Sequence, residues 1–168
     1  MLVLQWNARS LRANGQEFKG FLQGLVVAPE VICVVETWWR VGDFELQIEG
    51  YDCVRRDREG TTGGGCATYV RRSGVSYRVL EVGVALEVVV VEVWIGGVSV
   101  CVVNFYHPGR KRLVLEELVA IKGVESRRVL WCGDFNAHGR VWGGSRTDAD
   151  GSVVEGLMDT LGLVCLND

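Results

Sequence analysis

The run LEVVVVEVWIGGVSVCVVNF, residues 86–105, decides the fold of this chain. Valine dominates it, and β-branched side chains favour strands over helices. The pair Gly96-Gly97 joins its two apolar halves through two residues, which is a strong signal for a β-hairpin. Glutamates and glycines interrupt the wider apolar region 82–105, so a hairpin fits it better than a membrane span.

Short apolar runs bounded by turn residues recur on both sides of this hairpin and predict further strands. Besides the two halves at 86–95 and 98–105, we expect strands at 2–6, 31–35, 51–55, 65–70, 75–81, 129–133 and 163–166. Helical spacing of apolar residues predicts helices at about 15–25, 111–122 and 152–161. Asn14 with Glu17, and Ser152 with Glu155, have the spacing of capping boxes. Because hairpins outnumber strand–helix–strand units, we expect one α/β domain, residues 1–168, with a mixed or mostly antiparallel sheet.

The composition is that of a folded protein rather than a disordered tail. Apolar residues make up 48%, and 18 Lys and Arg stand against 21 Asp and Glu, for a net charge of −3. That balance does not indicate nucleic-acid binding, but arginines gather at 55–58, 71–72, 110–112 and 127–128. These clusters are read either as ordinary solvated loops or as loops that contact phosphate.

The six cysteines show no C-x-x-C spacing, and most lie in apolar runs, which favours buried, reduced thiols and an intracellular protein. Only His107 and His138 are present, so a zinc cluster is not expected. His107 is interpreted as a loop or surface residue, and His138 as a DNA-facing or loop-stabilising residue. The first residues, MLVLQWN, lack the pattern of a secretory signal.

Polar side chains that suit metal and phosphate chemistry stand where predicted strands stop. Asn7, Glu36 and Tyr106 each follow an apolar run, and Asp134 with Asn136 follows another. Each has an ordinary structural reading as a turn residue, strand end or helix cap, but together they form one chemical set. A carboxylate is the hard oxygen ligand that Mg²⁺ prefers, and a tyrosine hydroxyl can donate to a phosphate. We expect Asp134 and Asn136 to point the same way from an extended segment while Phe135 points into the core.

At these positions the sequence resembles the endonuclease/exonuclease/phosphatase superfamily, whose fold is like that of deoxyribonuclease I. The resemblance rests on QWNARSL (5–11), VVETWW (34–39), GGGCATYVRR (63–72), VVNFYHPG (102–109) and GDFNAH (133–138). The stretch from GDFNA through WGG and T-D-x-x-G to L-x-x-L-N is similar to the endonuclease domain of non-LTR retrotransposons. The resemblance covers essentially the whole chain and implies a four-layer α/β/β/α sandwich that here lacks its last strands.

The resemblance also implies roles for named residues. Glu36 would bind Mg²⁺ or Mn²⁺ with Asn7 beside it, and Tyr106 would contact the scissile phosphate. Asp134 would act on the attacking water and Asn136 would orient the phosphate. Further candidates for contact with DNA are Arg9, His138, Arg71 and Arg110. The implied reaction is Mg²⁺-dependent nicking of DNA, in the nucleus, by part of a longer protein that also carries a reverse-transcriptase region, with no membrane partner.

The family pattern continues with an S-D-H motif beyond Asp168, so the sequence leaves open whether this chain turns over and predicts weak activity or none. A non-catalytic, transposon-derived remnant that binds DNA or protein is one alternative, which the missing motif favours. A phosphatase that acts on a small phosphate ester is the other, although the WGG and T-D-x-x-G strings argue against it.

Overall fold

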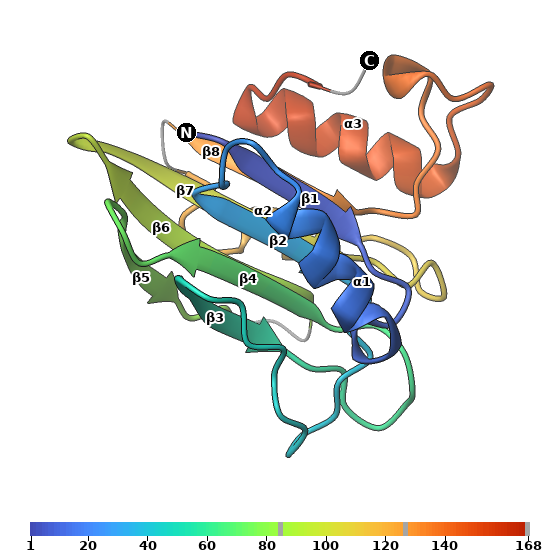
Figure 1. Ribbon diagram of the computed structural model, residues 1–168. Coiled ribbons are helices and arrows are strands. Elements are labelled where there is room, and N and C mark those ends of the chain that lie inside the picture. Colours follow the sequence, from blue (N-terminus) through green and yellow to red (C-terminus); the bar gives the residue numbers. More distant parts are fainter. Residues whose placement is uncertain (84–85, 126–127, 167–168) are drawn as a thin grey trace.

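The computed structural model describes residues 1–83, 86–125 and 128–166, so Arg127 of the predicted cationic clusters lies outside the described residues. Figure 1 shows two stacked sheets with helices on their outer sides. The elements are β1 (Val3–Asn7), α1 (Leu11–Gln23), β2 (Val31–Val35), β3 (Tyr51–Arg56), β4 (Cys66–Arg71), β5 (Ser76–Leu80), β6 (Glu87–Ile95), β7 (Val98–Tyr106), α2 (Leu115–Val119), β8 (Val129–Asp134), a 3₁₀ turn (Arg140–Trp142) and α3 (Ala149–Leu161).

Each sheet has four strands and mixes parallel with antiparallel pairing, as predicted. The first sheet has the order β1-β2-β4-β3 and the second the order β5-β6-β7-β8. β1 runs parallel to β2, and β7 runs parallel to β8, whereas the other neighbours are antiparallel. The predicted hairpin is confirmed: β6 and β7 meet at Gly96 and Gly97, whose φ angles of 57° and 81° are those of a type I′ turn.

Three apolar clusters fill the spaces between four layers. Alternate residues of β2 face opposite sides, because side chains in a strand alternate. Val31, Cys33 and Val35 pack between the two sheets, while Ile32 and Val34 pack toward α1. The outer face of the second sheet is covered in the same way by α2 and α3. The α/β/β/α architecture that the sequence predicted is therefore confirmed.

The starts predicted for the first and third helices were wrong. α1 begins at Leu11, because Ser10 and not Asn14 caps it: Ser10 Oγ accepts from Ala13 N–H at 3.1 Å. α3 begins at Ala149 with Asp148 as its cap.

Two further boundaries differ from the predictions. The second helix covers only Leu115–Val119. Residues 163–166 form no strand, because the chain turns back after α3 through a hydrogen bond from Leu163 N–H to Met158 O at 2.8 Å. Within the described ranges, no helix has the length and apolar character that crossing a membrane requires.

Candidate functional site at the strand ends

Four strands deliver polar residues to one edge of the sandwich. Asn7 ends β1 and Glu36 follows β2, and these strands are parallel neighbours. Tyr106 ends β7 and pairs in register with Asp134, which ends β8. Parallel neighbours end at the same edge, so each sheet contributes two of these residues. The distance along the chain between them is large, but the topology brings their side chains together.

Asn7 joins the two sheets at this edge. Its amide Nδ2 donates to Glu36 Oε1 and to Asp134 Oδ2, each at 2.9 Å. Its Oδ1 accepts from Arg9 N–H at 3.1 Å, so both polar ends of the side chain are engaged. Glu36 and Asp134 therefore lie on either side of one amide group, and the predicted convergence of these three residues is confirmed as geometry.

The loops that carry the site hold unusual backbone conformations. All the non-glycine residues with positive φ in the described parts of the chain lie in the loops after β1, β2 and β8: Arg9, Ser10, Glu36, Trp38 and Asn136. Such conformations cost on the order of 1–3 kcal/mol each and persist only where the surroundings enforce them. Their concentration at one edge makes that edge the candidate functional site.

Asp134 is held from two directions. Its Oδ1 accepts from Asn136 N–H at 2.9 Å, while Oδ2 accepts from Asn7. Asn136 does not continue an extended segment, because its φ of 45° turns the chain and sends its amide to His107 O at 2.7 Å. The prediction that Asp134 and Asn136 project alike from a strand was therefore wrong, although Phe135 does pack inward, 5.0 Å from the Phe105 ring.

Tyr106 is almost buried and lies against a cation that the sequence analysis did not assign to the site. The Arg58 guanidinium is 5.5 Å from the centre of the Tyr106 ring, and Arg58 Nε donates to Glu87 Oε1 at 2.7 Å. Burial raises the pKa of Tyr106, and the negative charge of Glu36 acts in the same direction against the opposing effect of Arg58. The hydroxyl therefore stays protonated at neutral pH and can donate a hydrogen bond.

Glu87 could have been found from the sequence. It opens the valine strand and pairs in register with Tyr106, so an acid at that position must lie close to the site. Its Oε2 accepts from Gly65 N–H at 2.5 Å, which attaches the glycine loop between β3 and β4 (residues 57–65) to the start of β6. Arg58 carried no comparable signal, because its partner lies 29 positions away.

The donor set suits a hard divalent cation. Glu36 and Asp134 supply carboxylate oxygens and Asn7 an amide, and Mg²⁺ is bound through one or two carboxylates, several waters and substrate phosphate. In the described part of the chain, no group of three or more His, Cys, Asp or Glu side chains is placed to enclose a metal by itself. The residues therefore fit an open site completed by water and a phosphate ester, not a closed structural site.

The two histidines differ from each other. His107 lies in the predicted loop but is buried, which corrects its surface assignment; its Nε2 is 3.6 Å from Asp150 Oδ2. His138 is exposed, and its Nδ1 lies 3.0 Å from Oδ2 of Asp148, the cap of α3. His138 therefore contacts the start of α3, which agrees with a loop-stabilising role, while its exposure leaves it accessible to a ligand.

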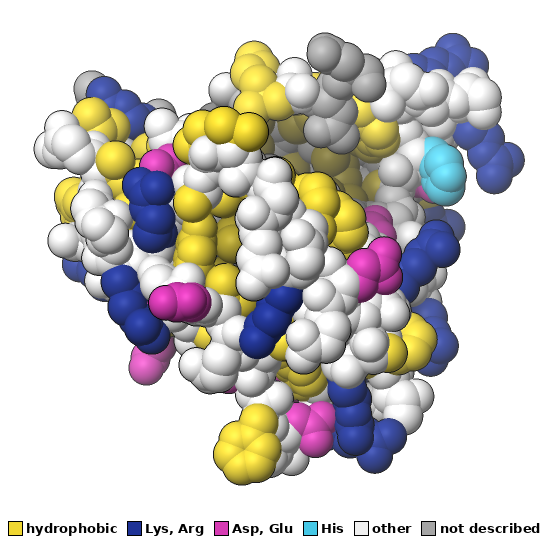
Figure 2. Space-filling model, in the orientation of Figure 1, with side chains coloured by type: hydrophobic (Ala, Val, Ile, Leu, Met, Phe, Trp, Pro, Cys, Tyr) yellow, Lys and Arg dark blue, Asp and Glu magenta, His cyan; other side chains and the backbone are white. Residues whose placement is uncertain are grey.

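The predicted arginines divide into two groups. Arg9 and Arg110 are exposed in the loops after β1 and β7, at the edge that carries the site. Arg71 lies at the other end of the first sheet and pairs with Glu30 at 2.6 Å, so the structure does not bring it to the site. On the right of Figure 2, the side where β1 and β8 end, Lys and Arg side chains gather around a histidine.

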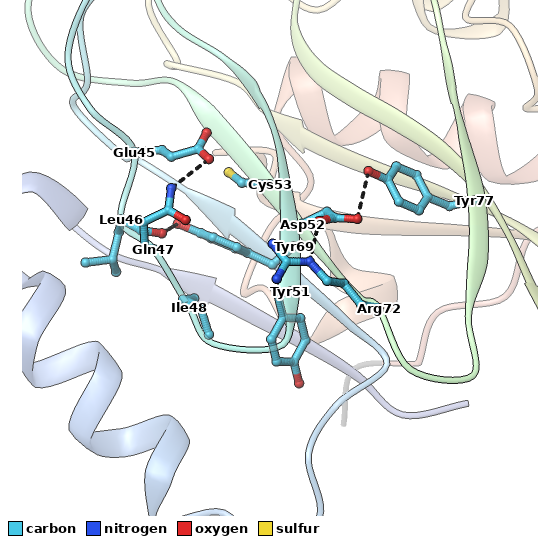
Figure 3. Close-up of a pocket in the computed structure, with 10 residues that line it drawn as sticks. All are labelled: Glu45, Leu46, Gln47, Ile48, Tyr51, Asp52, Cys53, Tyr69, Arg72 and Tyr77. Atoms are coloured by element: carbon cyan, nitrogen blue, oxygen red, sulfur yellow. Dashed lines mark hydrogen bonds and ion pairs between the residues drawn. The ribbon is translucent and has the colours of Figure 1, made fainter.

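A separate pocket lies at β3, and none of the predicted site residues lines it. Its volume is about 410 Å³, and Figure 3 shows its polar groups bonded to one another. Asp52 accepts from Arg72 Nε at 2.6 Å and from the Tyr77 hydroxyl at 3.5 Å. Because these groups satisfy each other, we place the candidate site at the strand ends and not in this pocket.

Comparison with known proteins agrees with the fold. The model of the Endonuclease/Exonuclease/phosphatase family matches residues 4–159. The endonuclease domain of TRAS1, a telomere-specific non-LTR retrotransposon, is similar at 21% identity and TM-score 0.75, over 99% of this chain and 74% of that one. A 3′ phosphatase from Neisseria, NExo, bound to a product DNA hairpin, is similar at 19% identity and TM-score 0.66, over 95% and 70%.

The AP endonuclease LMAP from Leishmania major is similar at 14% identity and TM-score 0.68, over 95% of this chain and 66% of that one. At these identities the solved structures support the fold alone. No curated protein matches the chain by sequence.

Proposed function

Because the chain belongs to the endonuclease/exonuclease/phosphatase family, we propose that its strand-end site hydrolyses phosphodiester bonds of DNA with the help of Mg²⁺ or Mn²⁺. The observation that carries the proposal is the double hydrogen bond from Asn7 Nδ2 to Glu36 and Asp134, one from each sheet. It holds two carboxylates close together, which supports the proposal that a cation and a phosphate bind beside them. By its resemblance to retrotransposon endonucleases, we also propose that the domain acts in the nucleus within a longer protein that carries a reverse-transcriptase region.

Each side chain has a proposed task. Glu36 and Asn7 would hold the cation, which when bound stabilises negative charge on the phosphate. Tyr106 donates a hydrogen bond to a phosphate oxygen, as its protonated hydroxyl allows. Asp134, fixed through both oxygens, accepts a proton from the attacking water. Asn136 has one amide hydrogen engaged by His107 O, so the other is available to orient the phosphate.

A plasmid nicking assay tests this proposal. The wild-type protein should convert supercoiled DNA to the nicked form in Mg²⁺ and not in EDTA. Glu36→Gln and Asp134→Asn should each lower the rate by about 10²-fold or more. Glu116→Gln serves as the control, because this carboxylate is exposed on α2. Equal nicking by the site variants would refute the assignment, and faster phosphate release from small esters would refute DNA as the substrate class.

Cation binding has an independent readout. Mg²⁺ should raise the unfolding temperature of the wild-type protein, because a ligand that binds only the folded state stabilises it. Glu36→Gln should abolish that rise, and Glu116→Gln should retain it. An unchanged rise in Glu36→Gln would remove Glu36 from the cation site even if the protein proves inactive on DNA.

A further inference from the structure

Trp38 is an exposed aromatic residue attached directly to the candidate site. Its indole Nε1 donates to Glu36 Oε2 at 3.3 Å, while the other oxygen of that carboxylate accepts from Asn7. The side chain is 43% exposed, whereas Trp39, the next residue, is buried against Arg55. A large apolar ring is thus held in contact with water beside a carboxylate that the fold has positioned.

The backbone fixes the position of this ring. Trp38 has a φ of 58°, an unfavourable conformation for a bulky side chain. Trp38 N–H donates to Gly64 O at 2.9 Å, and Thr37 N–H donates to Gly65 O at 3.3 Å. The loop after β2 and the glycine loop after β3 are therefore joined, as their neighbouring paths in Figure 1 show. A residue needed only to fill surface would not require this strained and doubly anchored backbone.

The glycine loop also limits where the indole can lie. A Cβ added at Gly63 would be 3.7 Å from Trp38 Nε1 and 3.8 Å from Arg58 Nη1, so the backbone of Gly63 borders both side chains. The glycine loop and Glu36 hold the nitrogen-bearing edge of the ring, and the exposed remainder faces solvent. Arg58, which is ion-paired with Glu87, packs against the same loop and helps to hold it in place.

From this geometry we infer that Trp38 is a positioning residue that stacks on an unstacked nucleobase next to the phosphodiester held at the strand-end site. An aromatic side chain stacks on any base, with little dependence on sequence. In an intact duplex the bases are covered by their neighbours, so the site favours a single-stranded or locally opened strand. The inference rests on the proposed function, because it takes the strand-end site to be where the phosphate binds.

A binding experiment separates this role from a purely structural one. Fluorescence anisotropy would be measured at fixed salt in Ca²⁺ with two single strands of about 12 nucleotides, one with all its bases and one with abasic sugars throughout. Trp38→Ala should weaken binding of the strand with bases by about 5- to 150-fold and change binding of the abasic strand by less than about 2-fold. Trp38→Phe keeps an aromatic ring but not the indole N–H, and its Kd for the strand with bases should stay within about 3-fold of the wild-type value.

Trp94→Ala is the matched control, since Trp94 is 36% exposed and lies near the other end of the second sheet. It should bind both strands as the wild type does, and unfolding curves check that each variant is folded. If Trp38→Phe behaves like Trp38→Ala, or if both strands are weakened equally, the indole only orients Glu36 and the stacking role is refuted. If the wild-type protein binds neither single strand, this inference is refuted, while plasmid nicking separately decides whether the proposed function holds.

Discussion

Asn104 offers a sharp test of how the two sheets are held together. It is completely buried on β7, and its amide Nδ2 reaches across the core to Val34 O at 3.1 Å, Ala67 O at 3.0 Å and Thr68 Oγ1 at 3.2 Å. The substitution Asn104→Leu keeps the number and branching of the side-chain heavy atoms and removes the donors. It thereby tests mainly the polar contact between the sheets.

The expected loss of stability follows from the contacts. The amide has two hydrogens, and a net contribution of about 1–1.5 kcal/mol each gives about 2–3 kcal/mol. Acceptors left without a partner add to this loss, while removal of Asn104 Oδ1, which is buried without a partner among the described residues, offsets part of it. We therefore expect a loss of about 2–3 kcal/mol from a total that for such domains is about 5–15 kcal/mol.

Urea unfolding followed by circular dichroism measures this loss. The midpoint should fall while the dependence of the free energy on urea stays constant, because the surface exposed on unfolding is unchanged. Thr68→Val removes one of the three acceptors and should cost about 0.5–1.5 kcal/mol. A loss below about 0.5 kcal/mol for Asn104→Leu would show that the buried amide does not stabilise the contact between the sheets.

Three further changes test the frame of the site. Gly133→Ala should prevent normal folding, seen as loss of the cooperative melt, because a Cβ there would overlap Phe105 O and φ is 131°. Arg58→Met should lower the free energy of unfolding, measured in urea, by about 2–4 kcal/mol, because it leaves the half-buried Glu87 without its cation. The double variant Arg58→Met/Glu87→Gln should lose less, and an equal loss in the single and double variants would contradict this explanation. The hydrogen bond from Gly151 N–H holds the pKa of Asp148 below its ordinary value of 3.8. The ionised Asp148 side chain therefore stabilises the folded protein fully above that pH, and this contribution is lost as the pH falls below it. The melting temperature of Asp148→Ala should accordingly depend less on acid pH than that of the wild type.

Most of the fold was predictable because its strands are valine-rich and bounded by turn residues. The hairpin at Gly96-Gly97 and the fully buried run Val31–Val35 were unambiguous. Helix starts were not, because more than one capping residue lies within a turn of each start: Ser10 is close to Asn14, and Asp148 is close to Ser152. Local sequence gives each candidate a similar capping energy, and tertiary contacts select among them.

The site was predictable only in part. Asn7, Glu36, Tyr106 and Asp134 stand at strand ends, where the order of strands alone brings them together. Glu87 could have been added to them from the register of the hairpin, which pairs it with Tyr106. Trp38 and Arg58, however, reach the site through contacts between loops, which depend on positive φ angles and on a glycine loop that folds back. No spacing in the sequence records such contacts, so these residues emerged only from the three-dimensional arrangement.

Because Asn7 bonds to one carboxylate from each sheet, the separation of Glu36 and Asp134 is tied to the thickness of the core between the sheets. Packed sheets lie about 10 Å apart, and protein interiors compress very little. The thickness of the core thus sets the distance between the two carboxylates of the site. An enlarged core side chain would change this distance while the chain is still folded, so the two carboxylates would be displaced before the protein unfolds.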